Sequence, residues 1–255
     1  MTNHKSEKIE FEGTQSTLSG ILHYPPRESK GGVVLAHCFT CSKSFKVMRR
    51  LATGIAEGGY SVLRFDFTGL GESEGEFSDT SVTTNVEDLQ AALSYLRERG
   101  HTPNAMVGHS LGGAATLLAA AREPDVRAVA TLAAPATADH VERAFSKSNV
   151  AEALASGRIR VEIAGRPFDI SSTFFEDLQR HHSLDHVTDS GCPILVIHPT
   201  NDSTVVIEEG EKIFAAARQP KWFVAIPDAN HLFSDSKHAI SAAEVVVTFF
   251  DTVIS

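Results

Sequence analysis

Short, almost continuously apolar runs alternate with longer segments of helical periodicity along most of this chain. Runs such as 33–37 and 194–198 are typical of strands buried on both faces of a sheet, and segments such as 82–99 are typical of amphipathic helices. Such an alternation implies right-handed crossovers and a mostly parallel sheet with helices on both faces. We therefore predict an α/β fold with strands near 8–11, 18–24, 33–37, 61–67, 105–107, 126–132, 194–198 and 222–226. Helices are predicted at 45–57, 82–99, 111–122, 208–218 and 240–254.

Residues 137–192 interrupt this rhythm. They carry more charge than their neighbours, and they contain a predicted hairpin, 159–163 with 167–170, followed by a predicted helix at 173–180. Long segments between two strands of one sheet often serve as insertions over an active site. We therefore predict one domain over residues 1–255, with 137–192 as a small inserted cap.

The chain is acidic, which limits the partners it can bind. Its 255 residues include 23 Lys and Arg against 32 Asp and Glu, a formal net charge of −9. This balance disfavours nucleic acid and anionic membrane surfaces. The most apolar long window, 105–121, is interrupted by polar residues and glycines, and the N-terminus lacks the apolar core of a signal peptide. With only three cysteines, we expect a cytoplasmic protein with a small-molecule partner, whose oligomeric state the sequence leaves open.

A G-x-S-x-G motif lies where a predicted strand meets a predicted helix, and it reads Gly108-His109-Ser110-Leu111-Gly112. A serine on such a sharp turn needs neighbours without a Cβ atom, and the helix start behind it supplies free amide groups. A glycine-rich turn that merely packs a helix on a strand is the alternative. The strand–turn–helix context favours a nucleophilic Ser110.

A serine hydroxyl becomes a strong nucleophile only when a base takes its proton and a carboxylate orients that base. Asp202 and His231 each follow a predicted strand of the second half of the chain. Because the carboxyl ends of parallel strands share one edge of a sheet, we predict a triad of Ser110, Asp202 and His231. Asp139 is a rival for the acid, whereas Asp228 lies close enough to His231 to shape its turn.

These motifs resemble those of the α/β-hydrolase superfamily over nearly the whole chain. The segments that carry the resemblance are 37–40, 64–73, 108–113, 201–202 and 230–231. Residues 37–43 and 165–168 look most like a serine-esterase branch whose members are sometimes fused to an OsmC-type domain. The resemblance implies an α/β-hydrolase fold with an eight-stranded sheet, a small cap, and ester hydrolysis without a cofactor.

Acyl transfer also needs N–H donors for the oxyanion that develops on the acyl group. One donor should be the amide of Leu111, directly after the nucleophile, and the other should come from the loop at 37–43. The resemblance assigns this second donor to Phe39. Many relatives have glycine where this chain has Cys38. The uncharged loop around Phe39 favours a neutral, partly apolar ester.

The resemblance also points to side chains that would line a substrate pocket. Those predicted are His37, Cys38, Thr40, Phe168, Phe174, Phe175 and Leu232. The three phenylalanines lie in or beside the predicted elements of the insertion. They have an equally good alternative, which is to pack the cap onto the body.

Two further patterns receive structural interpretations. Cys38 and Cys41 form a C-x-x-C, but the thioredoxin-like context is missing, which favours a plain loop over a redox function, with a conditional disulfide as the alternative. His181, His182 and His186 lack the partner ligands of a zinc motif, so no metal site is predicted.

The sequence therefore predicts a serine hydrolase that cleaves carboxylic esters through an acyl-enzyme intermediate. Thioesterase, amidase and perhydrolase chemistry would use the same triad, so these activities stay open. A non-enzymatic alternative is a catalytically inactive α/β-hydrolase scaffold that serves in binding. The complete triad argues against this alternative.

Overall fold

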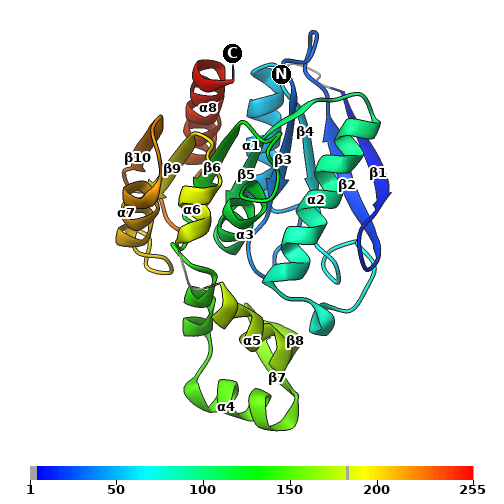
Figure 1. Ribbon diagram of the computed structural model, residues 1–255, viewed down its shortest axis with the longest axis vertical. Helices are drawn as coiled ribbons and strands as arrows, with labels where there is room; N and C mark the ends of the chain where they lie inside the picture. The colour runs from blue at the N-terminus through cyan, green and yellow to red at the C-terminus, as the bar shows by residue number, and fades with distance from the viewer. Residues whose placement is uncertain (1–4, 182–183, 255) are drawn as a thin grey trace.

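The computed structural model describes residues 5–181 and 184–254, and an eight-stranded sheet forms its centre (Figure 1). β1 and β2 form an antiparallel hairpin, β2 is antiparallel to β4, and every other neighbouring pair in this sheet is parallel. The predicted α/β fold with a mostly parallel eight-stranded sheet is therefore confirmed. In spatial order the strands are β1 (Ser6–Glu12), β2 (Thr17–His23), β4 (Ser61–Phe65), β3 (Gly32–Ala36), β5 (Pro103–His109), β6 (Ala128–Leu132), β9 (Ile194–Pro199) and β10 (Lys221–Ile226).

Helices cover both faces of this sheet. On one face lie α1 (Lys46–Glu57) and α8 (Ser236–Val253), and on the other lie α2 (Val82–Glu98), α3 (Leu111–Ala120) and α7 (Ile207–Ala216). Successive side chains of β3 alternate between the two cores: Val33 packs on the α1 and α8 side, and Val34 packs on the other. A central strand with both faces covered reads as a continuous apolar run, which is why the sequence predicts these strands well.

The strand that leads to Ser110 is longer than its apolar run. β5 spans Pro103–His109 and all seven of its residues are buried, whereas the sequence predicts only 105–107. Asn104 and His109 are polar side chains that the fold buries near the two ends of this strand. A hydrophobicity pattern does not register such positions as strand.

Residues 137–192, called the insertion below, leave the sheet after β6 and return to it at β9 (Figure 1). The predicted hairpin and the predicted helix are both present, but the sequence did not predict α4, because Ala153 is the one buried residue that its pattern contains. The hairpin is a separate two-stranded sheet. The elements of the insertion are η2 (Ala138–Ala144), α4 (Lys147–Ser156), β7 (Arg158–Ile163), β8 (Arg166–Ser171), α5 (Ser172–Arg180) and α6 (Asp185–Asp189).

α8 closes one face of the sheet with a buried side that includes Ala242, Val246 and Phe250. Its apolar residues are thus used in the core. Within the described ranges, no helix has both the length and the apolar character that crossing a membrane requires.

Candidate active site

Ser110 lies on the sharp turn between β5 and α3, in a backbone conformation (φ 55°, ψ −127°) that L-residues rarely adopt. Two glycines of the motif make this turn sterically feasible. A Cβ atom on Gly112 would lie 2.3 Å from the carbonyl oxygen of His37, and one on Gly108 would lie 2.4 Å from the carbonyl oxygen of Gly112. The turn therefore holds the serine in a strained geometry that its neighbours enforce.

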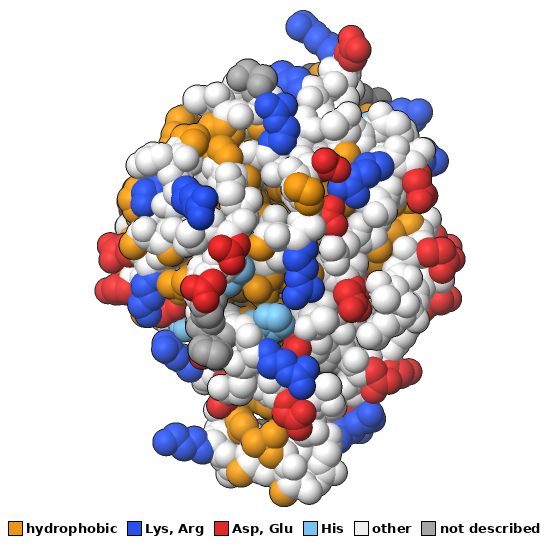
Figure 2. Space-filling view, in the orientation of Figure 1, with side chains coloured by type: hydrophobic (Ala, Val, Ile, Leu, Met, Phe, Trp, Pro, Cys, Tyr) orange, Lys and Arg blue, Asp and Glu red, His pale blue; other side chains and the backbone are white. Residues whose placement is uncertain are grey.

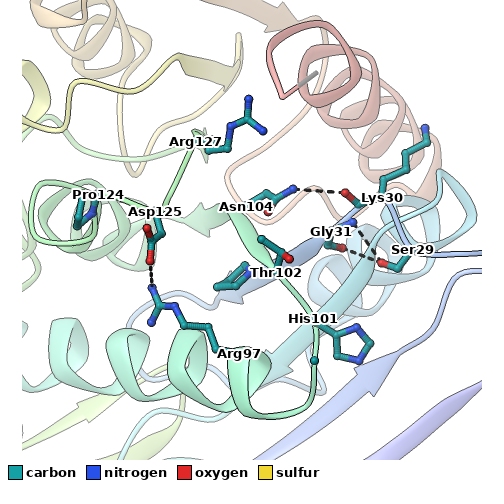
Figure 3. Close-up of a pocket in the computed structure, with 12 residues that line it drawn as sticks. Ser29, Lys30, Gly31, Arg97, His101, Thr102, Asn104, Pro124, Asp125 and Arg127 are labelled. Carbon is teal, nitrogen blue, oxygen red and sulfur yellow. Dashed lines mark hydrogen bonds and ion pairs between the residues drawn. The ribbon is translucent and has the colours of Figure 1, made fainter.

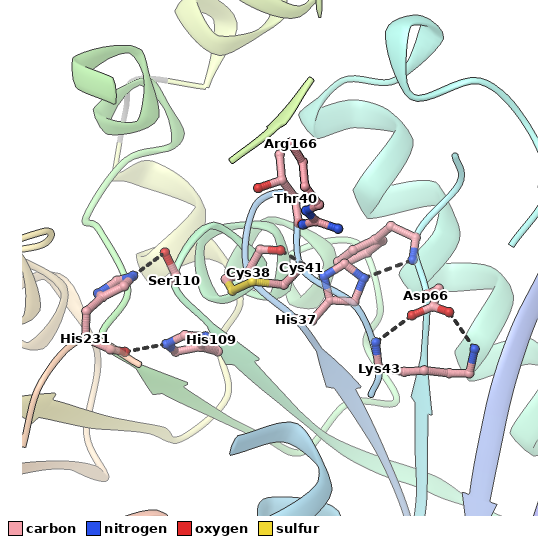
Figure 4. The surroundings of a disulfide bond; sticks show 11 residues. His37, Cys38, Thr40, Cys41, Lys43, Asp66, His109, Ser110, Arg166 and His231 are labelled. Carbon is pink, nitrogen blue, oxygen red and sulfur yellow. Dashed lines mark hydrogen bonds and ion pairs between the residues drawn. A yellow bond between two sulfur atoms is a disulfide. The ribbon is translucent and has the colours of Figure 1, made fainter. Parts of the chain in front are cut away.

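The side chains of Ser110, His231 and Asp202 form one hydrogen-bonded chain at the carboxyl ends of β5, β9 and β10. Ser110 Oγ lies 3.1 Å from His231 Nε2, and His231 Nδ1 lies 2.7 Å from Asp202 Oδ2. Figure 4 shows the serine and the histidine facing each other. The geometry is that of a nucleophile, a general base and a carboxylate that orients the base.

The Asp202 carboxylate is held in its ionised form. Its side chain is fully buried, and Oδ1 accepts hydrogen bonds from the amides of Thr204 (2.8 Å) and Val205 (2.9 Å). Burial by itself would raise the pKa of Asp202, but the hydrogen bonds from His231 and from these amides hold that pKa below its ordinary value. The acid is thus negatively charged where it meets the histidine.

The two rival carboxylates are placed elsewhere. Asp139 lies in η2 and lines a separate polar pocket together with His140 and Glu209. Asp228 is exposed and has a positive φ of 58°, in the turn before His231, as the sequence suggests for a turn residue. Asp202 is the carboxylate that is hydrogen-bonded to the histidine ring.

His109 occupies the first x position of the G-x-S-x-G motif, directly before the serine. It was not identified from the sequence as a site residue. Its buried ring donates a hydrogen bond from Nε2 to the carbonyl oxygen of His231 (2.7 Å), as Figure 4 shows. Burial is the main cause that lowers the pKa of His109 to about 3, and the neighbouring His231 lowers it further. A neutral His109 therefore links the turn that carries Ser110 to the loop that carries His231.

Residues Cys38–Cys41, which contain the predicted oxyanion donor Phe39 and are called the oxyanion turn below, follow β3 and face the start of α3. The amide of Cys41 donates to the carbonyl oxygen of Cys38 (3.1 Å), and the two cysteines form a disulfide (Figure 4). The interpretation of this segment as a plain loop is therefore wrong, because the turn brings the two sulfur atoms together. Leu111 is the first residue of α3, so its amide has no acceptor within the helix.

A buried ion pair anchors the chain just beyond this turn. Lys43 Nζ lies 2.5 Å from Asp66 Oδ2 with both side chains 1% exposed, and it also contacts Ser19 (3.1 Å) and Glu72 (2.7 Å). The backbone amide of Lys43 donates to the same aspartate at 2.5 Å. Because Asp66 follows β4, this pair fixes the loop after β3 to the loop after β4.

A small cavity lies directly behind the oxyanion turn. Six of the predicted site residues line it, and Phe67, Leu70 and Phe77 are among their neighbours. These six residues are His37, Cys38, Phe39, Thr40, Leu111 and Phe174.

Three predicted pocket residues lie outside this cavity. Phe168 packs edge-on against Phe77 with ring centres 5.1 Å apart, and Phe175 packs in the same way against Phe145 (5.1 Å). Phe168 thus packs the insertion onto the body, as the alternative interpretation holds, whereas the contact of Phe175 with Phe145 lies within the insertion. Leu232, beside the catalytic histidine candidate, is 41% exposed at the surface.

A larger polar pocket lies at the opposite edge of the sheet (Figure 3). It includes Thr102 and Asn104 at the start of β5, whereas Ser110 follows the end of that strand. Arg97 on its rim is paired with Asp125 (3.4 Å). The two sites are thus separated by the length of β5.

No group of three or more metal-ligating side chains occurs in the part of the chain that the structure describes. His182 lies outside the described residues. His181 Nε2 lies 3.1 Å from Thr83 Oγ1, so this ring contributes to the contact between α5 and α2.

The comparisons with known proteins agree with this fold. Residues 33–244 match the family described as "Alpha/beta hydrolase family". An "Uncharacterized protein YfhR" of Salmonella typhi is 28% identical over 211 residues, which is 80% of this chain and 66% of that relative, so this chain spans just under two thirds of its length.

Two solved structures are also similar. The crystal structure of an esterase domain from a Rhodothermus marinus protein is 35% identical, with a TM-score of 0.79, over 98% of this chain and all of that one. Est1E from Butyrivibrio proteoclasticus with bound ferulic acid has a TM-score of 0.83 at 23% identity, over 96% of this chain and 99% of that one.

Proposed function

The chain belongs to the alpha/beta hydrolase family, and from this premise we propose that it is a serine hydrolase that cleaves carboxylic esters. The observation that carries the proposal is the hydrogen-bonded chain from Ser110 through His231 to Asp202. A buried carboxylate, a histidine and a strained serine at one edge of a parallel sheet have the geometry of acyl transfer. The likeness to an esterase domain at 35% identity supports the same reaction class.

In the proposed reaction, Ser110 Oγ attacks the acyl carbon while His231 Nε2 takes the hydroxyl proton. Asp202 orients the imidazole and stabilises the imidazolium. The amides of Phe39 and Leu111 would hold the negative oxygen of the tetrahedral intermediate, and one such donor is typically worth ~3 kcal/mol. The bond from the acyl carbon to the alkoxy oxygen then breaks, and the alcohol leaves with the proton from His231. Water attacks the acyl-enzyme by the same steps and releases the acid.

The proposed acyl group is small and apolar. The cavity behind the oxyanion turn has a volume of only about 10 Å³, about the room of one water molecule, and Phe39, Phe77 and Phe174 contribute aromatic walls. An acyl group that enters between these rings would have to move them apart, and its carbonyl would then lie near the amides of Phe39 and Leu111. In this proposal the insertion acts as a cap within one domain, and the relation to OsmC-fused esterases stays a prediction.

Covalent labelling with a fluorophosphonate tests the nucleophile directly. The folded wild type should react once per chain, and Ser110→Ala should not react. Ser94→Ala, which changes an exposed serine on α2, serves as the matched control and should label like the wild type. Absence of labelling in the wild type would favour the inactive scaffold over the enzyme.

A panel of matched substrates tests the reaction class. We expect p-nitrophenyl acetate and other short oxygen esters to turn over faster than the corresponding thioesters and amides. Thioesters that turn over far faster than matched oxygen esters would replace the esterase proposal with a thioesterase. The same comparison with added hydrogen peroxide would reveal perhydrolase chemistry.

A further inference from the structure

We propose that Arg166 and Phe174, both in the insertion, are positioning residues that hold the tip of the oxyanion turn in place. The inference rests on the proposed function, because it gives the turn its role through the amide of Phe39. It assigns a task in the reaction to a segment that does not carry any triad residue. Residues 38–41 of this turn are themselves uncharged, and the guanidinium of Arg166 touches them from the insertion.

The first contact is a hydrogen bond between the insertion and the oxyanion turn of the body. Nη2 of Arg166, the first residue of β8, donates to the carbonyl oxygen of Thr40, as seen in the placement of the two residues in Figure 4. Thr40 is buried and has a positive φ of 57°, so its peptide groups are held in an uncommon conformation. The Arg166 guanidinium lies 5.2 Å from the ring centre of Phe168, which fixes the direction of the long side chain.

The second contact is an aromatic stack on Phe39, whose amide is the proposed oxyanion donor. The ring of Phe39 stacks on Phe174 of α5, with ring centres 5.4 Å apart and an angle of 22° between the planes. Phe77 and Phe145 contact the same ring at 5.7 Å and 6.2 Å. Aromatic pairs in such arrangements attract each other beyond the effect of burying their area.

The insertion is itself attached to the body, through α5. Asp177, one turn along α5 from Phe174, accepts hydrogen bonds from the amide and the hydroxyl of Thr83 at the start of α2, both at 2.8 Å. Phe174 itself is 4% exposed. α5 is thus attached to the body on one side and to Phe39 on the other.

The body of the protein holds the ends of the oxyanion turn, and the insertion holds its tip. The disulfide joins Cys38 to Cys41, and the buried Lys43 pair fixes the chain beyond them. Phe39 and Thr40 lie between these anchors and receive the stack and the hydrogen bond from the insertion. A preorganised donor loses most of its value when it shifts by about 1 Å, so these two contacts should act on turnover.

Steady-state kinetics of Arg166→Gln and Phe174→Leu test the proposal. Each variant should lower kcat about tenfold. In Arg166→Gln, whose side chain does not line the cavity, KM should change less than about twofold, because the contact acts on the oxyanion and not on the ground state. Arg166→Lys and Phe174→Tyr keep a donor and a ring, so each should recover most of the loss. Arg160→Gln is the control, since this exposed arginine lies on the same hairpin and faces Asp169 instead.

Two ester substrates that differ only in a remote carboxylate distinguish positioning from substrate binding. Loss of kcat on both esters supports the proposal. A loss in Arg166→Gln confined to the carboxylate ester, or seen in KM alone, would overturn it in favour of an anion-binding role. Unchanged kcat in both Arg166→Gln and Phe174→Leu would overturn it as well.

Amide hydrogen exchange provides a readout that does not depend on activity. The amides of Phe39 and Thr40 should exchange faster in both variants than in the wild type and in Arg160→Gln. Equal exchange in all four proteins would contradict the proposal. A wild type that neither hydrolyses esters nor reacts with a fluorophosphonate would refute the proposed function, while the exchange data would still decide whether the insertion holds the turn.

Discussion

The Nε2 atom of His109 donates a hydrogen bond to the carbonyl oxygen of His231, and the two atoms are 2.7 Å apart. The residue directly before the proposed nucleophile is therefore hydrogen-bonded to the backbone of the proposed general base. His109 Nδ1 is buried without a hydrogen-bond partner among the described residues, so Nε2 makes the one hydrogen bond of this ring there. This hydrogen bond thereby ties the turn after β5 to the loop after β10.

His109→Ala should lower kcat about tenfold, because the loop of His231 loses its tie to the nucleophile turn. The deleted ring should also lower the free energy of unfolding by about 3 kcal/mol through the cavity it leaves. In His109→Gln the amide nitrogen can still reach the carbonyl oxygen, so activity should be largely kept. Ester hydrolysis and urea unfolding of both variants check this. Equal kcat in His109→Ala and the wild type would show that the hydrogen bond has no role in turnover.

Reduction of the Cys38–Cys41 disulfide should weaken the oxyanion turn without unfolding the protein. A bond that closes so short a loop stabilises the fold by about 2 kcal/mol on a chain-entropy basis. We expect the Cys38→Ser/Cys41→Ser double variant to have a lower Tm and a kcat reduced about threefold, less than the loss of a whole oxyanion donor.

Dithiothreitol separates this effect from general reduction. It should lower the Tm and kcat of the wild type toward those of the double variant and should leave the double variant unchanged. Cys192→Ala keeps the disulfide and removes the buried free thiol, so it should respond to the reductant like the wild type. A wild type that is insensitive to the reductant, with both thiols shown to be free, would contradict the prediction.

Lys43→Met should destabilise the protein by about 3 kcal/mol or more, because it leaves the buried carboxylate of Asp66 without its cation. Lys8→Met is the matched control. Lys8 also pairs with Glu72 (3.2 Å), but both of those side chains are more than half exposed, so its removal should cost less than about 1 kcal/mol.

Chemical denaturation of the two variants measures these differences. A double-mutant cycle with Asp66→Asn should show strong coupling, since the second substitution removes the charge that the first one leaves unpaired. Additive effects of the two substitutions would show that the pair does not interact energetically.

The sheet and the positions of the triad candidates were predictable from the sequence for one physical reason. Strands that are covered on both faces are apolar over most of their length, so their ends lie close to the point where polar residues resume. Ser110, Asp202 and His231 follow such ends, and parallel strands bring their carboxyl ends to one edge. The order of these three residues along the chain then predicts that they form one hydrogen-bonded chain.

The pattern predicted neither α4 of the insertion nor the buried polar contacts. α4 buries Ala153 from among its ten residues, so its periodicity is too weak to predict a helix. Lys43 looks like a surface residue in the sequence, and its burial depends on two loops from different strands. Likewise, whether Phe168 or Phe174 reaches the cavity depends on how the hairpin and α5 sit on the body, which local propensities do not determine.

Asp88 should make the stability of the protein fall as the pH rises from about 4 to about 7. This carboxyl group is buried in α2 and accepts hydrogen bonds from the amide (2.8 Å) and the hydroxyl (3.0 Å) of Thr68. Burial raises its pKa to about 6 in spite of these hydrogen bonds, which lower it. The folded state therefore binds a proton more tightly than the unfolded state, whose Asp pKa is about 3.9, and ionisation above pH 6 destabilises the fold.

Asp88→Asn should remove this pH dependence, because the amide keeps the shape of the side chain and cannot ionise. The full contribution is on the order of 3 kcal/mol at pH 7, and about 1 kcal/mol of it should develop between pH 5 and pH 7. Urea unfolding at these two pH values should thus show the variant gaining about 1 kcal/mol relative to the wild type as the pH rises. Glu98→Gln, at an exposed position on the same helix, should follow the wild type. A wild type and an Asp88→Asn variant whose stabilities change in parallel with pH would show that Asp88 ionises at the same pH in the folded and unfolded states.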